Sequence, residues 1–258
     1  MKVITFCSFK GGTGKTTLSA NVACYLAEKK NKKVLLIDLD PQANLTTYMW
    51  GDSADSFTSS ELLVNGWDFD SFVKKTTTKN LSIIPSEITS EVFRNQASGT
   101  GSFFQGNLSN VLKKSSNFDF CIIDTPPSLG FLAKEAFLAA DGLVVCLSPE
   151  PFSVVGLHKI KEFSDSIPNL NIKIFGVAIS FWETRNSTNN LYINSVNSVF
   201  SGNIPRYLIR RDISFSRAIL KEKPVFSVYP NSRASSDIKT LSDGIYKEVF
   251  SLSLESIR

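Results

Sequence analysis

The chain has 258 residues, of which 42% are hydrophobic and 20% are charged, and its formal net charge is +4. This length suits one α/β domain with a large buried core, and the composition is ordinary for a globular protein. No apolar run approaches the roughly 18 residues of a membrane-spanning helix. The chain starts directly in a strand pattern, without the apolar core and cleavage site of a signal peptide. We therefore expect a cytoplasmic protein with no membrane span.

Cysteine and histidine usage excludes several kinds of site. The cysteines are Cys7, Cys24, Cys121 and Cys146, all inside apolar strand or helix patterns and none in a C-x-x-C pair. We expect buried reduced thiols rather than disulfides or metal ligands. The sequence has one histidine, His158, so a Ser-His-Asp mechanism is not expected.

A glycine-rich turn joins the first predicted strand, at residues 3–6, to the first predicted helix, at residues 18–27. Such a turn lets successive backbone N–H groups point at a phosphate, and the helix N-terminus adds partial positive charge. Lys15 can reach the β- and γ-phosphates of a nucleotide, and the Thr16 hydroxyl can ligate Mg²⁺. Three fixed glycines, two fixed lysines and one Ser/Thr position arise by chance in a chain of this length with a probability on the order of 10⁻⁴ or less. The predicted nucleotide-binding residues here are Lys10, Gly11, Gly12, Thr13, Gly14, Lys15, Thr16 and Thr17.

Carboxylates end two later apolar strands. Residues 34–37 are a continuous apolar run that leads into Asp38 and Asp40, and the strand at residues 118–124 ends in Asp124. In an open α/β sheet the carboxyl ends of the strands border the ligand crevice, and Asp124 is placed to hold Mg²⁺. Taken alone, the first pair could instead be an acidic turn in which Asp40 caps a helix that starts at Pro41.

The remaining pattern predicts the fold. Residues 50–115 are the least informative; we expect a strand at 81–85, a helix at 87–96, a flexible loop at 97–102 and a helix at 108–114. Further strands are predicted at 143–147 and 172–179, and helices at 153–164, capped by Ser153, and at 187–200. This alternation favours a parallel sheet with right-handed crossovers. The expected fold is a single α/β domain over residues 1–258: a P-loop NTPase with a mostly parallel, twisted sheet and helices on both faces.

The positive charge is concentrated near the C-terminus. Residues 206–239 contain eight basic and three acidic residues, a net charge of +5 against −1 for the rest of the chain. A clustered basic surface is typical of proteins that bind a phosphate backbone. A solvated basic face without a partner is the plain alternative.

Several motifs resemble those of one family. In the glycine-rich turn, Phe9 stands where the common P-loop has its first glycine, and Lys10 adds a second lysine. This K-G-G-x-G-K-[ST] form resembles the deviant P-loop of the ParA and MinD ATPases. The D-x-D-P-Q at 38–42 and the D-T-P-P-S at 124–128 resemble switch I and switch II of that group. The sequences I-R-R-D-I at 209–213, K-P-V at 223–225 and Y-P-N-S-R-A at 229–234 resemble the C-terminal pattern of ParA partition ATPases.

The resemblance implies ATP and Mg²⁺ as cofactors and assigns roles to particular residues. It makes Lys10, Lys15 and Asp40 catalytic: Asp40 orients the attacking water, and Lys10 crosses a dimer interface to the partner's nucleotide. The metal residues it implies are Thr16, Asp38 and Asp124. The segment that contains Ile209, Arg210 and Asp212 lies near the adenine, and Arg211 and Arg233 contact DNA. The chain departs from the pattern at Arg210 for proline, Arg217 for glutamate and Glu222 for glycine.

The function implied is that of a ParA-type chromosome or plasmid partition ATPase, cytoplasmic and associated with the nucleoid. Its ATP-dependent sandwich homodimer binds DNA non-specifically, and a ParB-type centromere-binding partner stimulates hydrolysis. No long extension precedes the first strand, so the helix-turn-helix domain of larger plasmid members is not expected.

Three related classes are the alternatives. A MinD-like membrane regulator needs a basic amphipathic tail, whereas residues 249–258 contain one arginine and one glutamate. A relative of nitrogenase iron protein needs cluster cysteines beyond its strands, whereas Cys121 and Cys146 lie within predicted strands. An ATPase that positions protein cargo would carry the same motifs and stays open.

Overall fold

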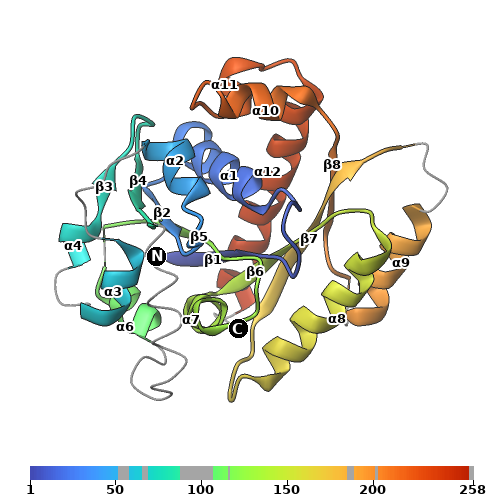
Figure 1. Cartoon of the computed structure of the whole chain (residues 1–258), viewed down its shortest axis with the longest axis horizontal. Helices are drawn as coiled ribbons and strands as arrows, with labels where there is room; N and C mark the ends of the chain where they lie inside the picture. Colours follow the sequence, from blue (N-terminus) through green and yellow to red (C-terminus); the bar gives the residue numbers. More distant parts are fainter. Residues whose placement is uncertain are drawn as a thin grey trace.

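One eight-stranded sheet runs through the part of the chain that the structure describes (Figure 1). The structure is a computed structural model, and it describes residues 1–51, 58–65, 69–87, 107–115, 117–184, 189–200 and 203–255. The strands are β1 (Lys2–Cys7), β2 (Val34–Asp38), β3 (Lys74–Lys75), β4 (Leu81–Ile84), β5 (Phe120–Asp124), β6 (Gly142–Leu147), β7 (Lys173–Trp182) and β8 (Arg206–Arg210). Their order is β3-β4-β2-β5-β1-β6-β7-β8, and only the β3–β4 pairing is antiparallel. The predicted mostly parallel sheet is confirmed.

Helices cover both faces of this sheet (Figure 1). One face packs against α1 (Lys15–Lys29), α2 (Asn44–Trp50), α10 (Ile213–Ile219), α11 (Val225–Val228) and α12 (Arg233–Glu255). The other face packs against α3 (Ser59–Asn65), α4 (Phe69–Phe72), α6 (Asn107–Lys114), α7 (Phe131–Ala139), α8 (Pro151–Ser166) and α9 (Asn189–Val199).

The central strands are buried on both faces, which explains their continuous apolar sequences. In β2, Leu36 packs against the layer that contains α1 and α12, while Leu35 and Ile37 pack against the opposite layer. In β5, Ile122 and Ile123 divide in the same way. Alternation of side chains across a strand therefore sends one apolar run into two separate cores.

Several predicted elements have different limits in the structure, and two of them concern residues near the site. The helix expected from Ser153 begins at Pro151, with Glu150 at the N-cap, so the Ser153 cap was wrong. Proline suits the first turn because its missing N–H would have no helical partner there. The strand expected to end at residue 179 continues to Trp182.

Other expectations are confirmed or lie outside the described residues. The four cysteines are all free and buried. In the described ranges, no helix has the length and hydropathy needed to cross a bilayer. Apart from residue 87, the predicted helix at 87–96 and the loop at 97–102 fall outside the described residues.

Strand register places the acidic residues together. Asp38 at the end of β2 is directly opposite Asp124 at the end of β5, and Phe6 of β1 is opposite Asp124 on the other side. The glycine-rich turn follows β1 by a few residues. Because these strands are parallel, the turn and both carboxylates meet at one edge of the sheet.

Tyr207 fixes the edge strand β8 to the rest of the fold. A methyl group on Gly176 of β7 would lie 2.3 Å from the ring, and one on Gly244 of α12 would lie 2.4 Å from the ring and its hydroxyl oxygen. The tyrosine ring therefore fills the space that these two glycines leave.

We expect Gly244→Ala to lower the free energy of unfolding by about 1 kcal/mol. Alanine gains about 1 kcal/mol over glycine in a helix, but overpacking costs about 1–3 kcal/mol. Chemical denaturation measures the difference. Gly130→Ala, at the N-cap of α7, is the control for a methyl group in open space, since nothing lies within 4 Å of it there. A Gly244→Ala protein more stable than the parent would contradict this packing argument.

Candidate functional site

The glycine-rich turn has the curled backbone that a phosphate-binding loop requires. Gly12 and Gly14 have φ angles of 75° and 80°, in the left-handed region that glycine adopts without steric cost. Gly14 is the N-cap of α1, and its carbonyl accepts a hydrogen bond from the Leu18 N–H at 2.9 Å. The first N–H groups of a helix have no partner within it. Those of α1 therefore form an anion site at the end of the turn.

Asp124 accepts hydrogen bonds from Lys15 and Thr16, the two predicted binding residues that follow Gly14. Its Oδ1 accepts a hydrogen bond from Lys15 Nζ at 3.0 Å, and its Oδ2 accepts one from the Thr16 hydroxyl at 2.7 Å. The Lys15 side chain is 6% exposed and that of Asp124 is fully buried. Burial by itself lowers the pKa of Lys15, but the charge of Asp124 and their hydrogen bond raise it above its ordinary value. Lys15 is thus held charged at the mouth of the turn.

Asp38, opposite Asp124 on the neighbouring strand, is fully buried and accepts three hydrogen bonds. Its Oδ1 accepts a hydrogen bond from the Asp40 N–H at 3.0 Å, and its Oδ2 accepts two from Thr46, from the N–H at 2.9 Å and the hydroxyl at 2.8 Å. The Thr46 oxygen in turn accepts the Ser86 N–H at 2.9 Å. Burial and the charge of Asp124 raise the pKa of Asp38 to about 7. Asp38 therefore fixes the loop after β2 and the start of α2 against the end of β2.

Asp40 lies in a cavity of about 670 Å³ that the glycine-rich turn also lines. Its Oδ1 accepts the Gln42 N–H at 3.0 Å, and it is 6% exposed. Helix α2 begins at Asn44 with Ala43 as its N-cap. The alternative in which Asp40 caps a helix from Pro41 is therefore wrong.

The donor set fits Mg²⁺. Mg²⁺ prefers oxygen ligands and keeps several waters or phosphate oxygens, and the oxygens of Thr16 and Asp124 are 2.7 Å apart. The described ranges contain no group of three His, Cys, Asp or Glu side chains able to enclose a metal. Within the turn, the Thr13 hydroxyl is buried without a hydrogen-bond partner, so it can donate to an anion bound in the cavity.

Lys10 is on the surface and is paired within its own chain. Its Nζ hydrogen-bonds the Glu150 carboxylate, and both side chains are about half exposed. The hydrogen bond from Lys10 lowers the pKa of Glu150. Exposed apolar side chains lie on the same two segments: Phe9, Phe152 and Val155.

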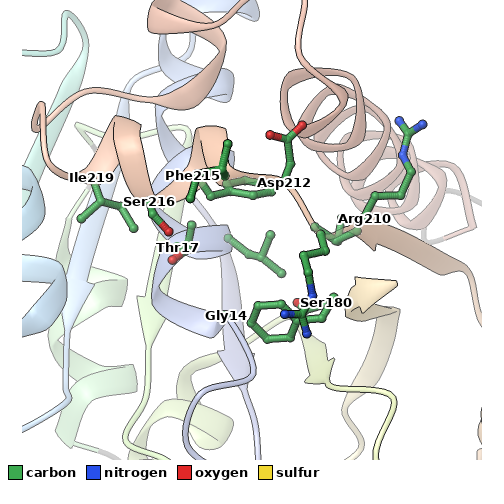
Figure 2. Close-up of a pocket in the computed structure, with 13 residues that line it drawn as sticks. Gly14, Thr17, Ser180, Arg210, Asp212, Phe215, Ser216 and Ile219 are labelled. Atoms are coloured by element: carbon green, nitrogen blue, oxygen red, sulfur yellow. The ribbon is translucent and has the colours of Figure 1, made fainter. Parts of the chain in front are cut away.

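A second, mainly apolar cavity of about 450 Å³ (Figure 2) adjoins the first, and both cavities are lined by Gly14, Thr17 and Ile219. Its walls come from α1, the end of β7, the end of β8 and α10. They include the predicted residues Ile209, Arg210 and Asp212. A shape of this kind suits a flat, partly apolar group attached to phosphates in the first cavity.

Arg210 and Asp212 have structural partners at this cavity. The Arg210 side chain points away toward α12 (Figure 2), where its Nη2 donates to Asp237 Oδ1 at 2.6 Å. Asp212 caps α10 by accepting the Ser214 N–H at 2.9 Å. Both residues therefore shape the cavity through the backbone they hold in place.

Arg211 and Arg233 lie together on the surface. Their side chains are 70% and 64% exposed, and Arg233 Nη2 donates to the Arg211 carbonyl at 3.4 Å. Glu183 and Asp212 are 3.6 Å and 3.9 Å from the two guanidinium groups. Arg217 and Glu222 are exposed as well, and Glu222 has a φ of 52° where the family pattern has glycine.

Sequence reasoning missed the partners of these residues. Glu150 is 140 positions from Lys10, and Asp237 is 27 positions from Arg210. Thr46 and Phe181 carry no motif at all. Only for Glu150 was there a signal, since it follows the end of a predicted strand, as Asp38 and Asp124 end theirs.

Comparison with known proteins gives consistent results. The family model described as an AAA domain matches residues 1–174. A virulence plasmid ParA family protein of Chlamydia psittaci is 49% identical over 252 residues, which are 97% of this chain and 96% of that protein. The sporulation initiation inhibitor protein Soj of Bacillus subtilis is 31% identical over 245 residues, which are 91% of this chain and 94% of that protein.

Solved structures share the fold. A plasmid partition protein of Borrelia burgdorferi bound to AMPPNP aligns with a TM-score of 0.78 at 26% identity, covering 97% of this chain and 98% of that one. Apo McdA of Cyanothece aligns with a TM-score of 0.85 at 23% identity, covering 96% of this chain and 99% of that one.

We expect Thr46→Val to lower the free energy of unfolding by about 1–3 kcal/mol, because the buried Ser86 N–H would lose its acceptor. Asp38 would also lose one of its three donors, so ATP hydrolysis should fall in the same protein. Thr46→Ser retains the hydroxyl and is the matched control. Denaturation curves and a phosphate-release assay measure both effects. Equal behaviour of the valine and serine variants would contradict the role given to the hydroxyl.

Proposed function

Because the chain belongs to the ParA family of P-loop ATPases, we propose that it is a partition ATPase that dimerises with ATP and then binds DNA without sequence preference. A ParB-type partner stimulates hydrolysis, and the protein associates with the nucleoid. The observation that carries the proposal is the proximity of two parts: the Lys15–Asp124–Thr16 cluster at the phosphate loop, and the exposed pair Arg211 and Arg233 beside the adjoining cavity.

The residues of the loop supply the binding chemistry. The N–H groups of the turn and Lys15 bind the β- and γ-phosphates, and the second cavity takes the adenine. Thr16 and Asp124 hold Mg²⁺, which supplies charge neutralisation at the phosphates when bound. Lys15 then exchanges its contact with Asp124 for phosphate oxygens. Stabilisation of developing charge by such preorganised donors contributes most of the rate.

Asp40 positions the attacking water. Its carboxylate lies in the same cavity as the loop, and the backbone around it is fixed through Asp38. The reaction needs a group that orients water in line with the γ-phosphate. Asp40 and the metal residues thereby connect hydrolysis to the position of the loop before α2.

Lys10 links hydrolysis to dimerisation. To reach the nucleotide of a second copy, its ammonium group has to leave Glu150. The exposed side chains of Phe9, Phe152 and Val155 add apolar surface on the same segments, of the kind that an interface covers.

The basic segment provides the DNA-binding surface. The net charge of +5 on residues 206–239 includes the exposed Arg211 and Arg233. Arginine forms bidentate contacts with phosphate. An ATPase that positions protein cargo would carry the same motifs, so the identity of the cargo separates the two functions.

We expect ATP-dependent binding to random-sequence duplex DNA that weakens steeply with salt, because phosphate contacts release counterions. Lys15→Ala should abolish the ATP dependence. Arg211→Ala and Arg233→Ala should each weaken binding and reduce the salt slope by about one. Lys113→Ala, which removes one exposed charge from the opposite face, is the matched control. Fluorescence anisotropy at two salt concentrations measures all of these. Absence of binding by the parent protein under every condition would refute the partition function.

We expect Glu150→Gln to raise the fraction of ATP-bound dimer a few-fold at a given concentration, because Lys10 no longer has to leave a charged partner. The effect is small because exposed ion pairs are weak. Glu162→Gln, which breaks the exposed Lys159–Glu162 pair on the same helix, is the control. Light scattering with a hydrolysis-deficient Asp40→Ala background measures the dimer. Unchanged or reduced dimerisation would show that Glu150 does not compete for Lys10.

A further inference from the structure

Phe181 has an unusual backbone conformation at the end of β7. Its φ angle is 56°, in the left-handed region that a bulky side chain rarely adopts. The pairing of β7 with β8 shifts register between Ile179 and Trp182, on either side of it. Its neighbours Ser180 and Trp182 are buried, whereas Phe181 is 39% exposed. Backbone strain of this kind persists where the surrounding structure imposes it, and it is concentrated at functional sites.

The Phe181 side chain has contacts with both functional regions. It lines the second cavity together with Gly14 and Ile209. The Arg211 guanidinium lies over its ring, 5.4 Å from the centroid, which is within the range of a cation–π contact. One ring therefore borders the cavity assigned to the adenine and also contacts an arginine assigned to DNA.

The contacts continue from Arg211 to the second arginine. The Arg211 N–H donates to the Trp182 carbonyl at 3.4 Å, and the Arg211 carbonyl accepts from Arg233 Nη2 at 3.4 Å. The competing pair with Glu183 is 3.6 Å long between two exposed side chains. An exposed pair of that kind is weak, and an exposed cation–π contact is of similar strength, so the ring of Phe181 shares with Glu183 in setting the direction of Arg211.

We propose that Phe181 is a positioning residue through which the base of the bound nucleotide controls the DNA-binding arginines. A purine in the cavity fixes the ring, and the fixed ring holds Arg211 in one orientation toward the DNA phosphates. Ordering a flexible side chain before binding reduces the entropy lost on binding. This inference rests on the proposed function, because it requires both ATP binding and contact of Arg211 with DNA.

The test compares Phe181→Asn with Phe181→Tyr. Asparagine tolerates the left-handed conformation, so the Asn variant removes the ring without adding backbone strain; thermal melting checks that it is folded. At saturating ATP and equal dimer fraction, we expect its DNA affinity to fall about two- to five-fold, the effect of one exposed cation–π contact. The tyrosine variant retains a ring and should bind DNA like the parent.

A double-mutant cycle with Arg211→Ala distinguishes positioning from a general structural effect. We expect Arg211→Ala to weaken DNA binding less in the Phe181→Asn background than in the parent. If the parent binds DNA, and Phe181→Asn binds equally well or the two effects are additive, the inference is overturned while the partition function stands. If the parent itself fails to bind DNA with ATP, the partition function fails first.

Discussion

The site depends on one buried carboxylate, Asp124, which is shared by the ammonium of Lys15 and the hydroxyl of Thr16. Taking a lysine and an aspartate out of water is costly, and their attraction compensates only if the geometry is good and the remaining polar atoms are satisfied. Here both carboxylate oxygens have a donor, and both donors are on the first turn of α1. The ion pair therefore fixes α1, and with it the glycine-rich turn, against the end of β5.

The same carboxylate accounts for the surroundings of Asp38. Strand register puts the two aspartates side by side, and like charges at that separation repel. Three donated hydrogen bonds from Asp40 and Thr46 favour the ionised form of Asp38, while burial and Asp124 disfavour it, and the balance raises its pKa. The group that holds the loop of Asp40 is thus electrostatically linked to the group that holds Lys15. A change in charge near Lys15 and Asp124 therefore changes the protonation equilibrium of Asp38, which holds the loop before α2.

The parts of the site that could be predicted from the sequence are those at the ends of strands. The turn, Asp38 and Asp124 could be found because a parallel sheet brings the ends of its strands to one edge, so motifs far apart in sequence meet through regular geometry. Asp237 and Phe181 could not be predicted, because their roles depend on side-chain directions and on a register shift between β7 and β8. The place of Glu150 after a predicted strand was a signal, but its pairing with Lys10 depends on side-chain directions as well. The start of α8 was misplaced because Ser153 and Pro151 are both acceptable helix-start residues, and proline, at the first turn, sets the earlier boundary.

The two adjoining cavities lie next to different surfaces. Lys10 and Glu150 are beside the phosphate loop, on segments with exposed apolar side chains, whereas Phe181 and Arg211 are beside the second cavity, on segments with exposed arginines. A ligand that fills only the phosphate cavity can act on the first surface alone. A ligand with both phosphates and a flat base contacts residues adjoining both surfaces at once. A nucleoside triphosphate has this form, so in the proposed function a single binding event would act on segments that adjoin the apolar surface and the basic surface together.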